Sequence, residues 1–308
     1  MKFHDTILVL LVVFCWSTGY LAQSYLVKFV PPFFAMFLES AIVSIVYSPI
    51  LLYKKPPANL SFLMVLGFLW GPGTYGSMLL AVSLGINVSV VSVIGKTNVI
   101  FAIIFARIFF NEKMNFATIL GILTSFTGLL FLLNTVHIFS NLPSLFSLMV
   151  FAVSWASYNM FVKKLSNMKK NQDEPLNMSV LVPWVSVCAM PQLFCISYCF
   201  EDWNIDIYSI PIHFIFVLAY QSLVVTCIVL SIWFRLITKY PMYKVGPFAL
   251  LLPVFGMISG IVLLREQVTT LQLISSIIMI SGLVIVSVQK INQYIQNVYT
   301  TRSLSIRQ

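Results

Sequence analysis

The stretch Ile104-Phe-Ala-Arg-Ile-Phe-Phe-Asn-Glu-Lys-Met114 and the stretch Ile258-Ser-Gly-Ile-Val-Leu-Leu-Arg-Glu-Gln-Val268 lie half a chain length apart in a sequence of 308 residues. In each of them a short polar hinge separates two long apolar runs. A shift of 154 residues pairs Ile104 with Ile258, Glu112 with Glu266, Gly128 with Gly282 and Leu129 with Leu283. The chain is therefore predicted to contain two copies of one structural unit.

The composition predicts that this unit lies in a lipid bilayer. Hydrophobic residues make up 59% of the chain and charged residues 9%, whereas a soluble domain carries about 25% charged residues. A chain with so few polar groups cannot cover its apolar surface in water. The apolar runs are continuous, which excludes the alternating pattern of a membrane β-barrel.

The apolar runs have the length of membrane-spanning helices, which need about 20 residues to cross about 30 Å of hydrocarbon. We expect an all-α polytopic membrane protein with ten transmembrane helices, at residues 6–26, 32–52, 61–82, 88–109, 115–134, 143–163, 178–199, 209–234, 245–264 and 268–288. The start of the chain, with Lys2 before an apolar run, also resembles a signal peptide. Because this run reaches spanning length, we expect a retained first helix.

The basic residues predict the orientation of these spans. If ten spans start from a cytoplasmic N-terminus, only Lys28 and Arg265 of the 18 Lys and Arg residues fall outside, and Lys96 falls within a span. The others lie on the cytoplasmic side, as the positive-inside rule requires. We therefore expect a multi-pass protein of the plasma (bacterial inner) membrane with both termini in the cytoplasm. The net charge of +9 then reflects topology, and no nucleic-acid partner is expected.

The two copies are predicted to cross the membrane in opposite senses, because five spans, an odd number, separate the hinges. We expect one five-helix repeat at 1–139, a second at 140–290 and a cytoplasmic tail at 291–308. Inverted repeats are typical of secondary transporters, which bind substrate near the midplane between the repeats. For the hinge residues Glu112 and Glu266, stabilisation of the following helix N-terminus is the favoured explanation.

A family resemblance follows from the order of several features along nearly the whole chain. These features are the surroundings of Trp16, Pro31-Pro32, Asn111-Glu112-Lys113, Ser154-Trp155-Ala-Ser-Tyr-Asn159 before Lys163-Lys164, Tyr240 to Pro247, Leu250 to Val254, and Leu264-Arg265-Glu266. Together they resemble the EamA-type transporters of the drug/metabolite transporter (DMT) superfamily, most closely the amino-acid-metabolite (cysteine/O-acetylserine) exporters. The resemblance implies ten helices, two five-helix repeats and a central cavity. Such proteins often carry an arginine where this chain has Glu39, which leaves the substrate open.

Two charged residues fall within predicted spans. A charge near the bilayer centre costs about 2.5–3.5 kcal/mol on insertion scales, so its default interpretation is functional. Glu39 and Lys96 are both expected about 10–12 Å from the outer end of their helices. They could form a structural ion pair or a zwitterion site in which Lys96 meets a carboxylate and Glu39 an ammonium group. Glu39 could also carry a coupling proton, or the side chains could snorkel.

Polar and aromatic side chains at helical spacing complete the candidate substrate-binding set, which is Lys96, Glu39, Trp16, Tyr20, Asn98, Trp155, Tyr158, Asn159, Tyr220 and Gln221. On the first predicted helix, Trp16, Tyr20 and Gln23 form one polar stripe at this spacing. Aromatic residues at such spacing also serve in helix packing. Gly71, Gly73 and Gly76 around Pro72 are expected to break the third span, and Pro247 and Pro253 the ninth. Interrupted spans in both halves point to a transporter site, although small residues also permit close helix packing.

The motifs predict no enzyme. We find no metal-ligand cluster, nucleophile elbow or P-loop, and the five cysteines share no ligand spacing. We therefore expect no catalytic residue, metal or cofactor.

The expected function is a secondary transporter that exports an amino acid or derivative by alternating access. The alternative is an importer or exchanger of a nucleotide-like or cofactor-like solute of the S-adenosylmethionine type. The expected partners are a small-molecule substrate, the lipid bilayer and, as a candidate coupling ion, a proton.

Overall fold

The computed structural model describes residues 1–84, 97–111, 116–133, 142–171, 175–252, 254–256, 258, 270–271, 273–282 and 284–285. Every regular element within these ranges is a helix. Lys96 and the hinge residues Glu112 and Glu266 lie outside the described residues.

The first half of the chain forms the helices α1 (Phe3–Leu26), α2 (Pro32–Val46), α3 (Ser48–Tyr53), α4 (Leu60–Trp70), η1 (Gly71–Gly76), α5 (Ser77–Ser83), α7 (Thr97–Phe110) and α8 (Phe116–Leu133). The helix α2 begins with Pro32, whose fixed φ and missing N–H suit the first helical position. The predicted span 32–52 is not one helix, because α2 ends at Val46 and α3 begins after Tyr47, with Pro49 in its first turn.

The second half forms α9 (Leu142–Lys170), α10 (Met178–Phe200), η3 (Ile207–Ser209), α11 (His213–Ala219), η4 (Tyr220–Val229), α12 (Leu230–Lys239), α13 (Met242–Val245) and η5 (Gly246–Leu251). A further apolar helix covers Leu273–Gly282. The helix α9 extends beyond the predicted span 143–163 and ends at the basic pair Lys169 and Lys170.

Five of the described helical segments are long and apolar enough to cross a membrane: Phe3–Leu26, Leu60–Ser83, Leu142–Lys170, Met178–Phe200 and His213–Lys239. Shorter apolar helices cover Pro32–Val46, Thr97–Phe110, Ile119–Gly128, Met242–Gly256 and Leu273–Gly282. The predicted all-α class with several membrane-spanning helices is therefore confirmed. The number of ten crossings stays a prediction.

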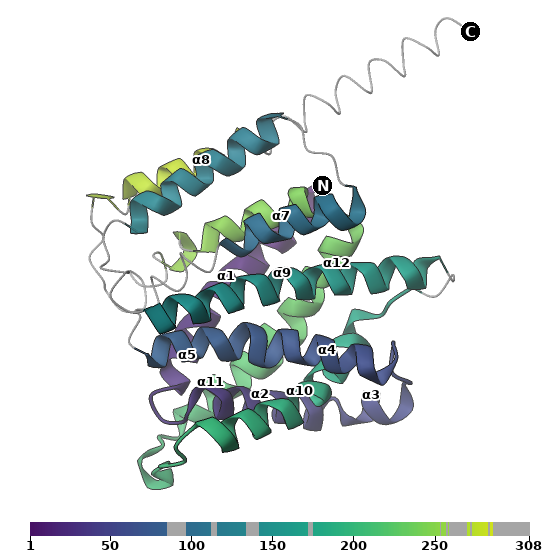
Figure 1. Cartoon of the computed structure of the whole chain (residues 1–308), viewed down its shortest axis with the longest axis vertical. Helices are drawn as coiled ribbons and strands as arrows, with labels where there is room; N and C mark the ends of the chain where they lie inside the picture. Colours follow the sequence, from purple (N-terminus) through teal and green to yellow (C-terminus); the bar gives the residue numbers. More distant parts are fainter. Residues whose placement is uncertain are drawn as a thin grey trace, which may run out of the picture.

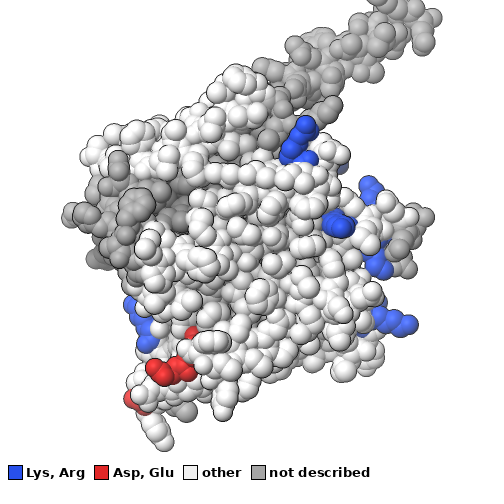
Figure 2. Space-filling view, viewed as in Figure 1, with Lys and Arg blue, Asp and Glu red and all other residues white. Residues whose placement is uncertain are grey.

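The charged side chains gather at opposite ends of the helices (Figures 1 and 2). Lys54 and Lys55 follow α3, and Lys169 and Lys170 end α9, at the edge where most of the blue side chains of Figure 2 lie. The acidic residues Glu201, Asp202 and Asp206 follow α10 at the other edge. The long helices run between these edges, so their middle parts lie where a bilayer would exclude water.

Two of the membrane-spanning segments contain a π-helical stretch. Leu60–Ser83 contains η1 and His213–Lys239 contains η4. The sequence predicted a break at Gly71 to Gly76, but the helix continues through it. Pro72 has no N–H to donate. Within the same stretch the hydroxyl of Thr74 donates to the carbonyl of Leu69 at 2.5 Å. The helix therefore widens by one residue rather than stopping, as π-bulges do.

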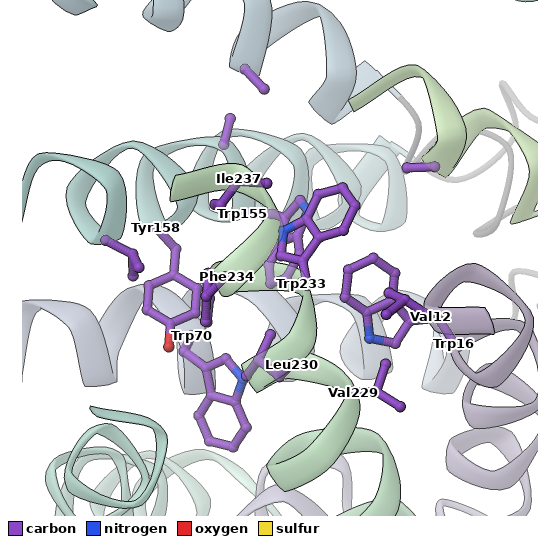
Figure 3. Close-up of a cluster of buried hydrophobic side chains, with 14 of the residues drawn as sticks. Val12, Trp16, Trp70, Trp155, Tyr158, Val229, Leu230, Trp233, Phe234 and Ile237 are labelled. Atoms are coloured by element: carbon purple, nitrogen blue, oxygen red, sulfur yellow. The ribbon is translucent and has the colours of Figure 1, made fainter. Parts of the chain in front are cut away.

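The core is rich in aromatic side chains from several helices (Figure 3). Trp70 of α4, Tyr158 of α9, and Trp233 and Phe234 of α12 are almost completely buried. Figure 3 shows them beside Trp16 and Trp155. Since lipid is as apolar as this core, the helices are held together mainly by close packing and by hydrogen bonds rather than by water exclusion.

Candidate functional site

A cavity lies where α1, η1, α7, α9, η4 and the segment around η5 meet. It is lined by Trp16, Gly19, Tyr20, Gln23, Thr74, Tyr75, Asn98, Phe151, Trp155, Gln221, Val225, Ala249 and Leu252. The centre of a water-sized sphere can occupy about 20 Å³ of it, which is room for about one water molecule. A metabolite therefore needs the surrounding helices to separate before it can occupy this central cavity.

Aromatic rings form much of the wall of the central cavity. Trp16 of α1 meets Trp155 of α9 edge to face, with ring centroids 5.5 Å apart. Trp16 also packs on Trp233 of α12 at 4.9 Å, and Tyr75 of η1 contacts Trp155 at 6.4 Å. Such edge-to-face arrangements place the positive edge of one ring on the negative face of another. The wall thus joins residues that are far apart in the sequence.

Amide side chains supply the polar part of the same wall. Gln23, Asn98 and Gln221 line the cavity and are all buried. Among the described residues, the indole Nε1 of Trp16 and the side-chain oxygen Oε1 of Gln221 have no hydrogen-bond partner. Buried polar atoms are normally paired. One donor and one acceptor are therefore available to a polar solute at the cavity.

The carboxyl group of Glu39 lies behind this wall. Glu39 is in the middle of α2 and only 1% exposed. The hydroxyl of Thr226 in η4 donates a hydrogen bond to the Glu39 carboxyl group, and the Gln23 side chain lies against it. Glu39 therefore connects α2 to η4 and reaches the cavity through Gln23. The predicted contact with Lys96 stays a prediction, because Lys96 lies outside the described residues.

Five of the ten predicted site residues line the cavity, namely Trp16, Tyr20, Asn98, Trp155 and Gln221. Three others support its walls. The Nδ2 of Asn159 donates to the Trp155 carbonyl at 2.7 Å, and its Oδ1 accepts from Trp233 Nε1 at 2.6 Å. Tyr158 packs on Phe234 at 5.0 Å. The hydroxyl groups of Tyr220 and Thr18 are 2.6 Å apart and join η4 to α1.

Sequence reasoning missed several lining residues, above all Thr74 and Tyr75. Both lie in η1, the Gly- and Pro-rich segment that the sequence did single out as an interruption. Gln23 was predicted on one polar stripe with Trp16 and Tyr20, and it lines the cavity on the same helix. The interrupted segment was the signal that could have identified Thr74 and Tyr75.

Comparisons with known proteins identify the family of the chain and a solved structure with a similar fold. The model of the EamA-like transporter family matches residues 6–134 and 142–288. A relative from Escherichia coli (strain K12), named "Probable amino-acid metabolite efflux pump", is 26% identical over 292 residues, covering 92% of this chain and 95% of the relative. A Salmonella typhimurium protein with the same name has the same identity and coverage. An uncharacterised transporter of Bacillus subtilis is 23% identical and covers 82% of the chain and 81% of its own length.

The fold also resembles that of a protein solved by crystallography. The two structures superpose with a TM-score of 0.72 at 15% sequence identity, covering 94% of this chain and 99% of the solved one. This likeness concerns the fold alone. Members of the matched family and the relatives above are named as transporters or efflux pumps, not as enzymes.

Proposed function

Because the chain belongs to the EamA-like transporter family, we propose that it is a secondary transporter that exports an amino acid or a derivative by alternating access. The observation that carries this proposal is the central cavity. Its lining residues come from both segments that match the family, Trp16, Tyr20 and Asn98 from the first and Trp155 and Gln221 from the second. A site between two such units can be opened to either side by moving one unit against the other.

The proposed architecture is ten helices in two inverted five-helix repeats, at 1–139 and 140–290, followed by the tail 291–308. Its support is the packing of α8 against the helix Leu273–Gly282, seen side by side in Figure 1. A side chain at Gly128 would meet Met279 and the Ser275 carbonyl. A side chain at Gly282 would meet Ser125 and the Gly121 carbonyl.

The two sets of contacts are equivalent when the two helices are exchanged. A shift of 154 residues converts positions 121, 125 and 128 into 275, 279 and 282. Residues late in one helix meet residues early in the other, so the two helices run antiparallel. An approximate two-fold axis between antiparallel helices is the expected relation of inverted repeats.

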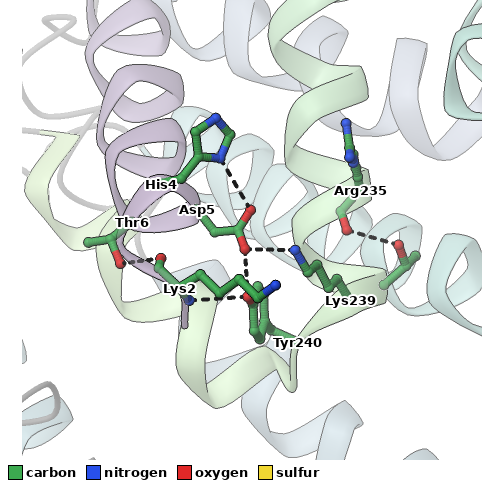
Figure 4. A network of polar contacts seen from close by, with 8 residues as sticks. Lys2, His4, Asp5, Thr6, Arg235, Lys239 and Tyr240 are labelled. Atoms are coloured by element: carbon green, nitrogen blue, oxygen red, sulfur yellow. Dashed lines mark hydrogen bonds and ion pairs between the residues drawn. The ribbon is translucent and has the colours of Figure 1, made fainter. Parts of the chain in front are cut away.

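Alternating access is supported by polar contacts between the two halves of the chain at both ends of the molecule. At one end, Asp5 of α1 accepts hydrogen bonds from Lys239 at 2.7 Å and from the Tyr240 hydroxyl at 2.6 Å (Figure 4). At the other end, Glu201 after α10 accepts from the backbone N–H groups of Phe33 at 2.7 Å and Phe34 at 3.1 Å. In the proposed cycle each set breaks when the cavity opens at its end.

The substrate assignment is supported by the names of the relatives and by the chemistry of the cavity. The free indole N–H of Trp16 can donate to a carboxylate, and the free oxygen of Gln221 can accept from an ammonium group. A proton is the proposed coupling ion, with Glu39 as its carrier.

The aromatic wall of Trp16, Tyr75 and Trp155 also suits stacking on a planar base. This second observation keeps an importer or exchanger of a nucleotide-like or cofactor-like solute as the alternative.

The proposed location is the plasma membrane, with both termini in the cytoplasm. The gathering of Lys and Arg at one edge supports this orientation, since cytoplasmic loops are rich in these residues. A reporter that is active only in the cytoplasm, fused after residue 308, is expected to be active. A silent reporter on a fully expressed fusion would contradict the orientation.

The transport proposal is tested by counterflow in proteoliposomes that contain the purified protein. The panel contains amino acids, nucleosides and methylated cofactors, with and without a pH gradient. We expect exchange of at least one amino acid or derivative, and no exchange with a Trp155→Ala variant that inserts normally. Exchange of nucleosides or methylated cofactors alone would favour the alternative. Exchange of none of the compounds would overturn the substrate class.

A further inference from the structure

A second and larger hollow lies between the end of α2, the start of α10 and the η4–α12 segment. Its volume is about 470 Å³, within the range of about 300–1,000 Å³ that is usual for ligand pockets. Its polar lining residues are Tyr47, Asn177, Ser179, Cys227, Ser231 and Arg235, and we refer to it as the Arg235 vestibule. The central cavity shares none of these residues.

The helix α12 has two chemically different faces. Trp233, Phe234 and Ile237 are buried in the protein core. Ser231, Arg235 and Thr238, spaced four and three residues apart, lie on the other face. Charged and polar residues of a membrane-spanning segment face protein or water rather than lipid. Since Ser231 and Arg235 line the vestibule, this face indicates that the vestibule contains water.

The vestibule has the charge of an anion site. Within the described ranges, Arg235 is the only charged residue that lines the vestibule, and its guanidinium group makes no ion pair. The helix α10 starts there, with Asn177 Oδ1 accepting from Ser179 N at 3.0 Å. The N-terminal end of this helix adds partial positive charge. A guanidinium group binds a carboxylate through two parallel hydrogen bonds.

A short chain of contacts links the vestibule with the central cavity. Cys227 lines the vestibule and contacts Tyr47. The preceding residue, Thr226, donates its hydroxyl to Glu39, which lies against the cavity residue Gln23. The Thr226–Glu39 hydrogen bond between α2 and η4 therefore links a residue next to the vestibule with a residue next to the central cavity.

We propose that the Arg235 vestibule is a water-filled docking site in which Arg235 binds the carboxylate of the transported solute before it passes Glu39–Thr226 into the central cavity. The identity of the solute rests on the transport function proposed above. The hydration and the anion preference of the vestibule rest on its geometry alone. The two parts are tested separately.

The vestibule itself is tested by thiol labelling in inside-out membrane vesicles, in which the proposed cytoplasmic edge faces the reagent. In a variant without the five native cysteines, Ser231→Cys introduces one thiol in the vestibule. Ile45→Cys is the matched control, because Ile45 of α2 is 70% exposed on the outer surface near the same end. We expect membrane-impermeant thiosulfonates to label the Ser231→Cys variant, severalfold faster with the anionic than with the cationic reagent. The Ile45→Cys variant is expected to stay unlabelled.

Adding Arg235→Gln to the Ser231→Cys variant is expected to remove the preference for the anionic reagent, and Arg235→Lys to restore part of it. Absence of labelling at Ser231→Cys would overturn the water-filled vestibule. An equal preference with and without Arg235 would overturn the anion site. Neither result depends on whether a transported substrate has been found.

The docking role is tested by transport kinetics once a carboxylate-bearing substrate is known. Arg235→Gln is expected to raise KM about tenfold, the effect of losing one charge-assisted hydrogen bond, with little change in the maximal rate. For an analogue in which an amide replaces the carboxylate, KM should be the same in Arg235→Gln and in the unchanged protein. An unchanged KM in Arg235→Gln would overturn the docking role and leave the transport proposal intact.

Discussion

Trp16 of α1 and Trp155 of α9 pack edge to face, with ring centroids 5.5 Å apart and ring planes at 81°. The two residues belong to different segments of the family match, and both line the central cavity. Their contact therefore lies where the two halves of the chain meet at the small central cavity. Any movement that enlarges this space must separate the two rings or shift them together.

The first prediction concerns this pair. Trp155→Phe should preserve protein levels and reduce the transport rate severalfold, because the edge-to-face contact with Trp16, worth about 0.5–1.5 kcal/mol, is weakened. Trp155→Ala should abolish transport and lower stability by roughly 3–5 kcal/mol. Initial transport rates and melting temperatures in detergent measure both effects. Phe216→Ala is the control, since Phe216 is 70% exposed, and a loss of transport in it would contradict a specific role for the pair.

The second prediction concerns the charges within the spans. Lys96→Ala and Glu39→Ala should each abolish transport while the protein inserts at normal levels. Unchanged transport in either variant would leave the structural ion pair as the role of these residues. Thr226→Val should lower the transport rate more than Thr226→Ser, because only serine keeps the hydroxyl that donates to Glu39. Leaving a buried polar group without its hydrogen-bond partner lowers the free energy of unfolding by about 1–3 kcal/mol. A melting curve can measure this loss.

The third prediction concerns the glycines of the proposed repeat axis. Gly128→Ala and Gly282→Ala should each destabilise the protein by about 1–3 kcal/mol, the cost of overpacking a tight contact. An added Cβ at Gly128 would lie 2.7 Å from both Met279 and the Ser275 carbonyl. Gly256→Ala should be nearly neutral, because no described atom lies within 4 Å of its added Cβ. Equal melting temperatures for all three variants would contradict the close helix contact.

The fourth prediction concerns the Asp5–Lys239 contact. Asp5→Asn should make the central cavity about two- to fivefold more accessible from the Lys239 end, since a partly exposed ion pair contributes about 0.2–1 kcal/mol. Lys239 is 44% exposed at its side chain. The measurement is the alkylation rate of a single thiol placed by Ala249→Cys, a cavity position.

The neighbouring His4 provides the control for this experiment. His4 lies 3.8 Å from Asp5, and its side chain is 80% exposed. His4→Asn should therefore leave the alkylation rate unchanged. Combining Asp5→Lys with Lys239→Asp should restore the original alkylation rate. If the cavity thiol of this charge-swapped protein reacted as fast as in Asp5→Asn, the result would contradict the role of the ion pair.

The positions of most long helices were predictable because they depend on local properties. A run of about 20 apolar residues must form a helix to satisfy its backbone in lipid, and α1, α9 and α10 begin within three residues of the predicted starts. Helical spacing likewise placed Trp16 and Tyr20 on one face of α1, which lines the cavity. The break after Val46 was not predicted, since the run continues in apolar residues through Pro49.

The sequence by itself determined the membrane class, the approximate helix positions and several aromatic residues of the site, because composition and periodicity are properties of short segments. Only the tertiary structure decided which faces meet. It turned Thr74 and Tyr75 toward the cavity through the π-helical segment η1, placed Asn159 behind the wall as the acceptor for Trp233, and brought Arg235 to a hollow beside Tyr47. A π-helical residue rotates the following side chains around the helix axis, and contacts between distant helices depend on all their neighbours at once.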